Sequence, residues 1–132
     1  MTEFITIDDA REHLRLDSGS DDPWLSMFIP AISEAVRLWL KDDWRAYEVE
    51  RDSDGEPVLD SDGRPVVVLD SDGEPVVRWA VKAACLVELA SQYRFREGEG
   101  KDNVMPADAG HGYVLNKAST ALLTPLRRPT VA

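Results

Sequence analysis

Apolar residues near the start of the chain follow the spacing of a helix. Thr6 and Asp9 stand three residues apart, which is the spacing of a capping box, and the apolar residues after them share one helical face. The pattern predicts a short helix that runs to about Leu16. An acidic, glycine-containing stretch then predicts a loop over residues 17–21.

A second apolar run follows this loop. Asp22 has the oxygen acceptor favoured at a helix N-cap, and Pro23 suits the first helical position. Apolar residues then recur at helical spacing and predict a long helix that fades near Trp44. Pro30 predicts a kink in this helix, or else the true start of a second segment.

Residues 51–77 contain an internal repeat. Asp-Ser-Asp-Gly occurs at 52–55, 60–63 and 70–73, and each copy is followed by one charged residue and then Pro-Val. Valine-rich runs separate the copies, and each glycine supplies the positive φ that a tight turn needs. The segment is predicted to form one or two β-hairpins that project between helices, with the prolines on edge strands.

The rest of the chain predicts two more helices. The first covers about 76–97 and is apolar around much of its girth, which is typical of the most buried helix of a small protein, with Trp79 in the core. A last short helix is predicted over 113–123, ended by Pro125. Residues 124–132 are predicted to form an extended C-terminal arm.

These elements predict a mainly α fold. The expected architecture is a small bundle of about four helices with a β-hairpin insertion between the second and third helices. The 132 residues allow a single domain over 1–132, and 43% apolar residues are enough for a core. No apolar run approaches the length of a membrane span, and the first residues do not form a signal peptide.

Charge narrows the possible functions. The net charge is −10, which excludes a broad basic face for nucleic-acid phosphates as the main function. Residues 1–50 hold twelve acids and five bases, 51–77 eight acids and two bases, and 78–132 five acids and eight bases. An acidic front and a mildly basic tail are two surfaces that can meet head to tail in an assembly.

The acidic repeat has closely spaced carboxylates, which are the ligands of calcium-binding loops. An EF-hand loop needs a bidentate glutamate at its twelfth position, but the three copies place Ser61, Leu69 and Trp79 there. Turn chemistry therefore explains the repeat better, with a weak divalent-cation site as the alternative. The six repeat aspartates are instead predicted to line a channel or face a partner; they are Asp52, Asp54, Asp60, Asp62, Asp70 and Asp72.

Catalytic chemistry finds little support in the sequence. Cys85 lies among apolar helical residues and is predicted to be a buried small hydrophobe. His13 and His111 have no serine, cysteine or second histidine near them in sequence. We therefore predict no enzyme activity, no cofactor and no metal site, in a protein of a reducing cytoplasm.

Two further sets of residues are candidates for contacts with other proteins. Trp24 and Trp44 stand at predicted helix ends and are candidates for a subunit interface, where tryptophan is enriched. The C-terminal arm is predicted to dock on an acidic neighbour. The candidate docking residues are Leu122 and Leu123 in the helix just before the arm, and Arg127 and Arg128 within the arm.

Three segments, in this order and spacing, resemble the head–tail connector (adaptor) proteins of tailed bacteriophages, the family typified by the connector of phage HK97. The first is the opening helix over 5–17 with the loop and helix that follow it at 21–40. The second is the helix at 80–97, and the third is the ending at 121–128. The repeat at 51–77 departs from the family, so no family role is carried onto it.

The resemblance implies a structural protein without catalysis. It implies a closed ring of about twelve subunits around a cyclic axis. The ring would lie beneath the portal in the virion neck, join it to tail or stopper proteins, and let double-stranded DNA pass without specific binding. Assembly would take place in the bacterial cytoplasm, without a membrane. The acidic balance suits a conduit that repels phosphate.

Two other functions stay open from the residues alone. The acidic insert suits a module that mimics DNA or sequesters a basic partner. The same insert, with its closely spaced carboxylates, suits a weak calcium-dependent module.

Overall fold

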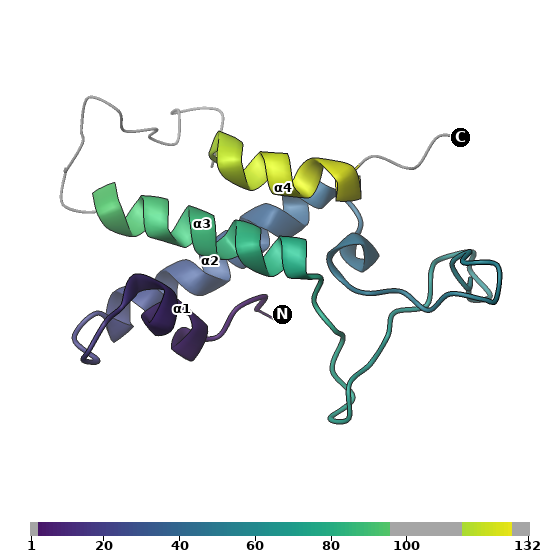
Figure 1. Ribbon diagram of the computed structural model, residues 1–132, viewed down its shortest axis with the longest axis horizontal. Coiled ribbons are helices and arrows are strands. Elements are labelled where there is room, and N and C mark those ends of the chain that lie inside the picture. The colour runs from purple at the N-terminus through teal and green to yellow at the C-terminus, as the bar shows by residue number, and fades with distance from the viewer. Residues whose placement is uncertain (1–2, 96–114, 128–132) are drawn as a thin grey trace.

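The computed structural model describes residues 3–95 and 115–127. Within these residues the chain is mainly helical, with four α-helices, as the sequence predicts. Figure 1 shows them gathered on one side, while the segment between α2 and α3 extends away from them. The elements are α1 (Ile7–Leu14), α2 (Asp22–Leu40), the 3-10 helix η1 (Asp43–Ala46), α3 (Trp79–Phe95) and α4 (Lys117–Arg127).

Helix α1 begins at the predicted capping box. The Asp9 backbone N–H donates to the Thr6 hydroxyl over 3.0 Å, and the Thr6 backbone N–H donates to the Asp9 carboxylate over 3.0 Å. The helix ends at Leu14, two residues before the predicted end. Arg11 on its surface donates from Nε to the Asp22 carboxylate over 3.0 Å, which ties α1 to the start of α2.

Helix α2 differs from the prediction at both ends. Its N-cap is Asp21 rather than Asp22, whose carboxylate binds Arg11 instead. It continues through Pro30 as one element, so a new start at that proline is wrong. Ile29 and Ile32, on either side, are both buried in the core, and this packing holds the helix together across the missing backbone donor. The helix ends at Leu40, before Trp44.

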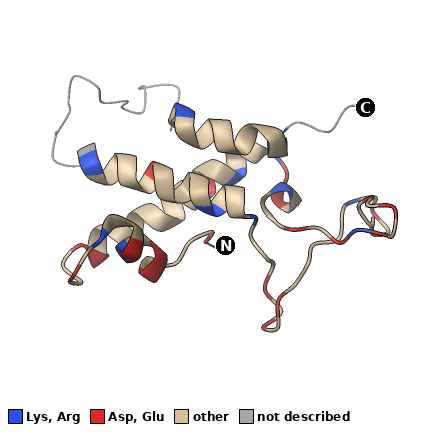
Figure 2. Cartoon of the chain, in the orientation of Figure 1, with Lys and Arg blue, Asp and Glu red and all other residues tan. Residues whose placement is uncertain are grey.

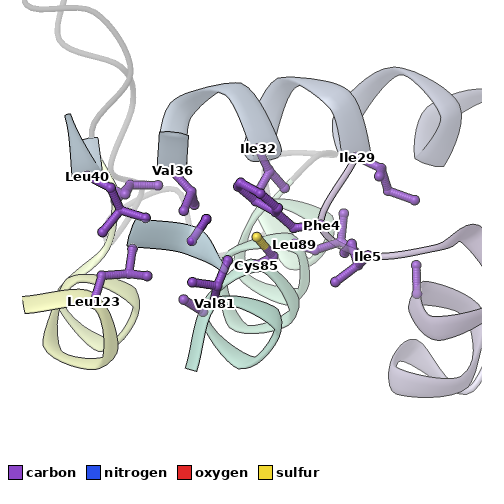
Figure 3. Packing of buried hydrophobic residues seen from close by; sticks show 14 of the residues in the cluster. Phe4, Ile5, Ile29, Ile32, Val36, Leu40, Val81, Cys85, Leu89 and Leu123 are labelled. Atoms are coloured by element: carbon purple, nitrogen blue, oxygen red, sulfur yellow. The ribbon is translucent and has the colours of Figure 1, made fainter. Parts of the chain in front are cut away.

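The core lies between α2, α3 and α4. Side chains of α2 and α3 point toward one another in Figure 3, with Phe4 and Ile5 of the N-terminal segment and Leu123 of α4 closing the same cluster. Arg37 of α2 lies over the Phe4 ring, with its guanidinium carbon 4.4 Å from the ring centroid. The packing therefore joins all four helices and the N-terminal segment around one hydrophobic core.

Helix α3 is the central element, as predicted, but it begins later and is less uniformly buried; residues 96 and 97 of the predicted helix lie outside the described residues. It begins at Trp79 and not at residue 76. Val81, Cys85 and Leu89 are buried on one side. Trp79 is 80% exposed, which corrects its assignment to the core. At the first position of the helix its side chain points away from the turns that pack against α2.

The insert between η1 and α3 forms turns but no strand within the described residues. Its pairings are isolated antiparallel bridges. Three backbone hydrogen bonds form a closed triangle. The Glu48 N–H donates to the Val76 C=O over 2.8 Å, and the Val76 N–H donates to the Val68 C=O over 3.0 Å. The Val68 N–H then donates back to the Glu48 C=O over 2.8 Å. Three chain segments thus pair around an axis instead of side by side, and the predicted β-hairpin is not confirmed.

A second triangle lies next to the first. The backbone N–H groups of Glu50, Val66 and Val58 donate to Val66, Val58 and Glu50 in turn, each over 2.8 Å. The three repeat turns connect the corners of the two triangles. The first and second turns join corners of this second triangle, and the third turn joins Val68 to Val76 of the first.

Helix α4 extends further toward the C-terminus than the sequence predicts. It begins at Lys117 and continues through Pro125 to Arg127, four residues beyond the predicted end at Leu123. Residues 124–127 are therefore helical, and the predicted extended arm is wrong for this part. The rest of that arm, 128–132, lies outside the described residues, as do residues 113 and 114 of the predicted helix.

Candidate interaction surfaces

The three repeat turns have the same internal hydrogen bonds. In the third turn, Asp70 accepts from the backbone N–H of Asp72 over 2.8 Å and of Glu74 over 3.0 Å. Asp52 and Asp60 accept in the same way in the first and second turns. The first aspartate of each repeat therefore closes its own turn, as Asx turns do.

The second aspartate of each repeat is available for other contacts. Asp54, Asp62 and Asp72 are exposed, and within the described residues their carboxylates form no hydrogen bond or ion pair. Each turn glycine has a φ near +80°, for example +79° at Gly73, which an L side chain rarely adopts. The repeat thus presents one exposed carboxylate at the tip of each of three closed turns.

The third turn differs from the other two in charge. Arg51 precedes the first turn and Arg64 belongs to the second, whereas the third carries Asp70, Asp72 and Glu74 with no base. Figure 2 shows its tip red and separate from the other two turns, which include blue segments. The third turn is the most acidic point of the insert.

A pocket of about 540 Å³ lies where the insert meets η1 and the end of α4. Its cationic side chains are Arg45, Arg51 and Arg78, and Glu56 is its acidic one. Trp44 and Pro125 line it as well. The pocket therefore has an excess of guanidinium groups, the side-chain group best suited to a carboxylate.

The predicted docking residues do not form one surface. Leu123 is fully buried in the core, so its side chain does not suit a docking role. Leu122 is 37% exposed, and the Arg127 guanidinium lies over the Trp39 ring at 4.6 Å. Arg128 lies outside the described residues. The sequence missed this division because the register of α4 on α3 depends on tertiary contacts.

The two candidate interface tryptophans are half-buried. Trp24 stacks on Phe28 with ring centroids 4.5 Å apart and meets Tyr93 edge-on at 5.4 Å. Trp44 lies between two pockets and has the Arg45 guanidinium 4.8 Å from its ring centroid. Both therefore have contacts inside the chain and keep only part of their surface for a neighbour.

Larger apolar exposure occurs at residues that the sequence did not predict to lie at an interface. Trp79 is 80%, Leu38 71% and Met27 63% exposed. Met27 and Leu38 are eleven residues apart on α2, which places them on the same helical face three turns apart. Trp79 has the Lys82 ammonium 5.3 Å from its ring centroid. These three are the strongest candidates for an interface with another protein.

Of the residues considered for catalysis, the structure places Cys85 in the core and His13 on the surface of α1. Cys85 is buried, and this burial, together with the nearby Glu88 charge, raises the pKa of its thiol to about 12. His13 is exposed on α1, and His111 lies outside the described residues. Among the residues that the structure describes, no three histidine, cysteine or acidic side chains are grouped to hold a metal ion.

Comparisons with known proteins find no match for the chain. No protein-family model matches it, and neither a curated protein nor a solved structure does. None of the described helices has the length and apolar content needed to cross a membrane.

Proposed function

We propose that this protein is a structural head–tail connector of a tailed phage or prophage. In this proposal the chain forms a ring beneath the portal, joins the capsid to the tail and lets DNA pass. It acts in the virion neck after assembly in the host cytoplasm, and it has no catalytic role. The resemblance of its helical segments to connector proteins suggested the function, and its surface supports it.

The observation that carries the proposal is the exposure of Trp79, Leu38 and Met27. All three large apolar side chains are more than 60% exposed, two on α2 and one at the start of α3. An assembly that covers them gains free energy by removing them from water. Such coverage is expected of a ring, in which every subunit meets two neighbours.

The acidic insert has a place in the same proposal. Three turns with exposed carboxylates give the insert a negative surface, which suits either the channel wall or the next protein in the stack. At a channel wall they repel the DNA phosphates and keep the DNA from binding. In this proposal the insert forms the predicted β-hairpin in the assembled ring, because pairing with a neighbouring subunit can extend the isolated bridges into strands.

Leu122 and Arg127 supply the portal contact in this proposal, together with the residues after them. Leu122 presents an apolar surface on α4, and Arg127 stands at the end of that helix. A helix end of this kind can place the following chain on a neighbouring protein.

Mixing the purified protein with portal particles from the same genome tests the proposal. The complex is separated by size and imaged in negative stain. We expect ring density stacked coaxially on the portal. Leu122→Ala should weaken the complex, and Ala118→Ser, at an exposed position of α4, serves as the matched control. No binding to the portal, by a protein shown to be folded, would contradict the connector function.

A second candidate function is an acidic module that binds a basic protein or mimics DNA. The all-acidic third turn favours it, because such a turn presents closely spaced charges on a fixed backbone. This function predicts a monomer or dimer with salt-sensitive binding to a basic partner. Asp70→Asn, Asp72→Asn and Glu74→Gln together would abolish that binding, and unchanged binding would contradict it.

A further inference from the structure

Two of the three guanidinium groups in the arginine pocket have no acidic partner among the described residues. The third, Arg45, forms an ion pair through Nε with the Asp42 carboxylate over 2.9 Å. Among the described residues, neither Arg51 nor Arg78 forms an ion pair, although Glu56 lines the same pocket. Nε of Arg78 is buried and has no hydrogen-bond acceptor in the part of the chain that the structure describes. A buried N–H without an acceptor costs free energy, so the pocket is better matched when a ligand with oxygen acceptors enters it.

The wall of the pocket is held in place by other contacts. Arg45 donates from Nη1 to the backbone C=O groups of Leu126, over 3.1 Å, and Arg127, over 2.7 Å. Arg51 donates from Nη1 to the Gly55 C=O over 2.9 Å, which holds its side chain beside the first turn. The guanidinium groups of Arg45 and Arg51 are thus positioned before any ligand arrives, which reduces the entropy lost on binding.

The chain itself carries a ligand of matching chemistry. The third turn presents Asp72 and Glu74 on a backbone closed by Asp70. None of the residues of this turn lines the arginine pocket of its own chain. The turn and the pocket can therefore meet only between two copies.

We propose that the pocket formed by Arg51, Arg78 and Arg45 binds the acidic third turn, 70–74, of a second copy. The contact is head to tail, because the turn and the pocket are different surfaces of the chain. Such a contact repeated around an axis closes a ring. The inference rests on the proposed ring and deepens it by naming the two surfaces that join neighbouring subunits.

Disulfide trapping in the full chain tests this contact without changing its charges. Ser71→Cys places a thiol in the third turn, and Pro125→Cys places one at an exposed position of the pocket wall. The two variants are mixed and oxidised, and the covalent dimer is measured. The native Cys85 is buried and does not compete. We expect the Ser71→Cys and Pro125→Cys pair to form the dimer at least about fivefold faster than the control pair.

The control pair combines Pro125→Cys with Ser61→Cys, which occupies the equivalent position in the second turn. Arg51→Glu in the Pro125→Cys chain should abolish the excess, while Arg64→Glu in that same chain, the same change outside this pocket, should keep it. Equal rates for the two pairs, or an excess that survives Arg51→Glu, would overturn the inference.

Failure of the inference and failure of the proposed function have different signatures. If a ring assembles while the two cysteine pairs form covalent dimers at equal rates, the connector function is retained and the proposed contact between turn and pocket is wrong. If disulfide trapping depends on Arg51 but the protein never forms a ring, the contact between turn and pocket is retained and the proposed ring is wrong.

Discussion

The Glu88 carboxylate of α3 accepts a hydrogen bond from the Ser119 hydroxyl of α4 over 3.1 Å, and both side chains are fully buried. The same carboxylate oxygen accepts from the backbone N–H of Asn116 over 3.1 Å, just before α4 begins. A carboxylate at a helix N-terminus also interacts favourably with the helix dipole. The contact fixes where α4 begins and which of its residues face the core.

Removing this carboxylate should destabilise the fold. Glu88→Ala leaves the Asn116 N–H without this acceptor and opens a cavity, so we expect the free energy of unfolding to fall by about 2–4 kcal/mol. Glu88→Gln keeps an oxygen acceptor and should cost less. Urea unfolding measures both, with the exposed Glu34→Ala as control, expected within about 0.5 kcal/mol of the native protein. A Glu88→Ala protein as stable as the control would contradict this role.

Arg45 closes the other end of α4 in a similar way. Arg45→Met keeps the apolar stem but removes the donors to the Leu126 and Arg127 carbonyls. We expect a loss of about 1–3 kcal/mol and faster amide exchange in the last turn of α4. Hydrogen exchange of α4 measures the local effect. Arg64→Met is the matched control, and equal exchange in the two variants would show that the cap is not needed.

The two aspartates of the third turn should differ in their effect on its order. Asp70→Ala removes the acceptor for the backbone N–H groups of Asp72 and Glu74, whereas Asp72→Ala removes a side chain without such bonds. We expect limited proteolysis within 70–76 to accelerate in Asp70→Ala and to stay near the native rate in Asp72→Ala. The reverse order would mean that turn closure does not depend on the first aspartate.

The local features that the sequence predicts well are those whose partners lie within a few residues. The capping box of Thr6 and Asp9 forms as expected, because it needs no residue outside its own turn. The same holds for the repeat turns, where an aspartate and a glycine three positions apart determine the backbone. Cys85 is buried as predicted, since the residues around it leave no polar face.

Features that depend on distant contacts were predicted less well. Pro30 and Pro125 both lie within helices, because packing on either side outweighs the lost backbone donor. The pairing of Glu88 with Ser119 spans 31 residues and has no local signal. The exposure of Trp79 follows from where α3 begins, and that point depends on how the insert pairs with η1. The hydrogen bond from the Arg78 N–H to the Ala46 C=O, over 2.9 Å, makes that junction.

The raised pKa of Cys85 predicts a change of stability with pH. The folded chain holds the thiol proton up to about pH 12, while the unfolded chain releases it near the ordinary value of 9.0. Above pH 9 the unfolded state therefore binds fewer protons, and this contribution to stability falls as pH rises from 9 toward 12. It is fully present below pH 9.

Urea unfolding of the native protein and of Cys85→Ala at pH 7 and pH 10 isolates this effect from other titrating groups. The native protein should lose more stability between these two pH values than the variant does, by about 1 kcal/mol. Equal losses would show that the thiol does not keep its proton in the folded state.

Trp79 should matter for assembly and not for folding. At 80% exposure its replacement removes little from the core, so Trp79→Ala should change the free energy of unfolding by less than about 0.5 kcal/mol. The assembled fraction should fall at the same time, because a large apolar group leaves the interface. Trp39→Ala is the contrasting variant, since Trp39 packs against the core and should lower stability. Unchanged assembly of Trp79→Ala would remove this residue from the interface.

The mass of the protein in solution tests the ring most directly. Light scattering coupled to size separation measures it over a range of concentrations, with and without portal particles. The account predicts an assembly of about a dozen copies of the 14.7 kDa chain, either in free solution or on the portal. A protein that stays at the mass of a single chain under both conditions would contradict it.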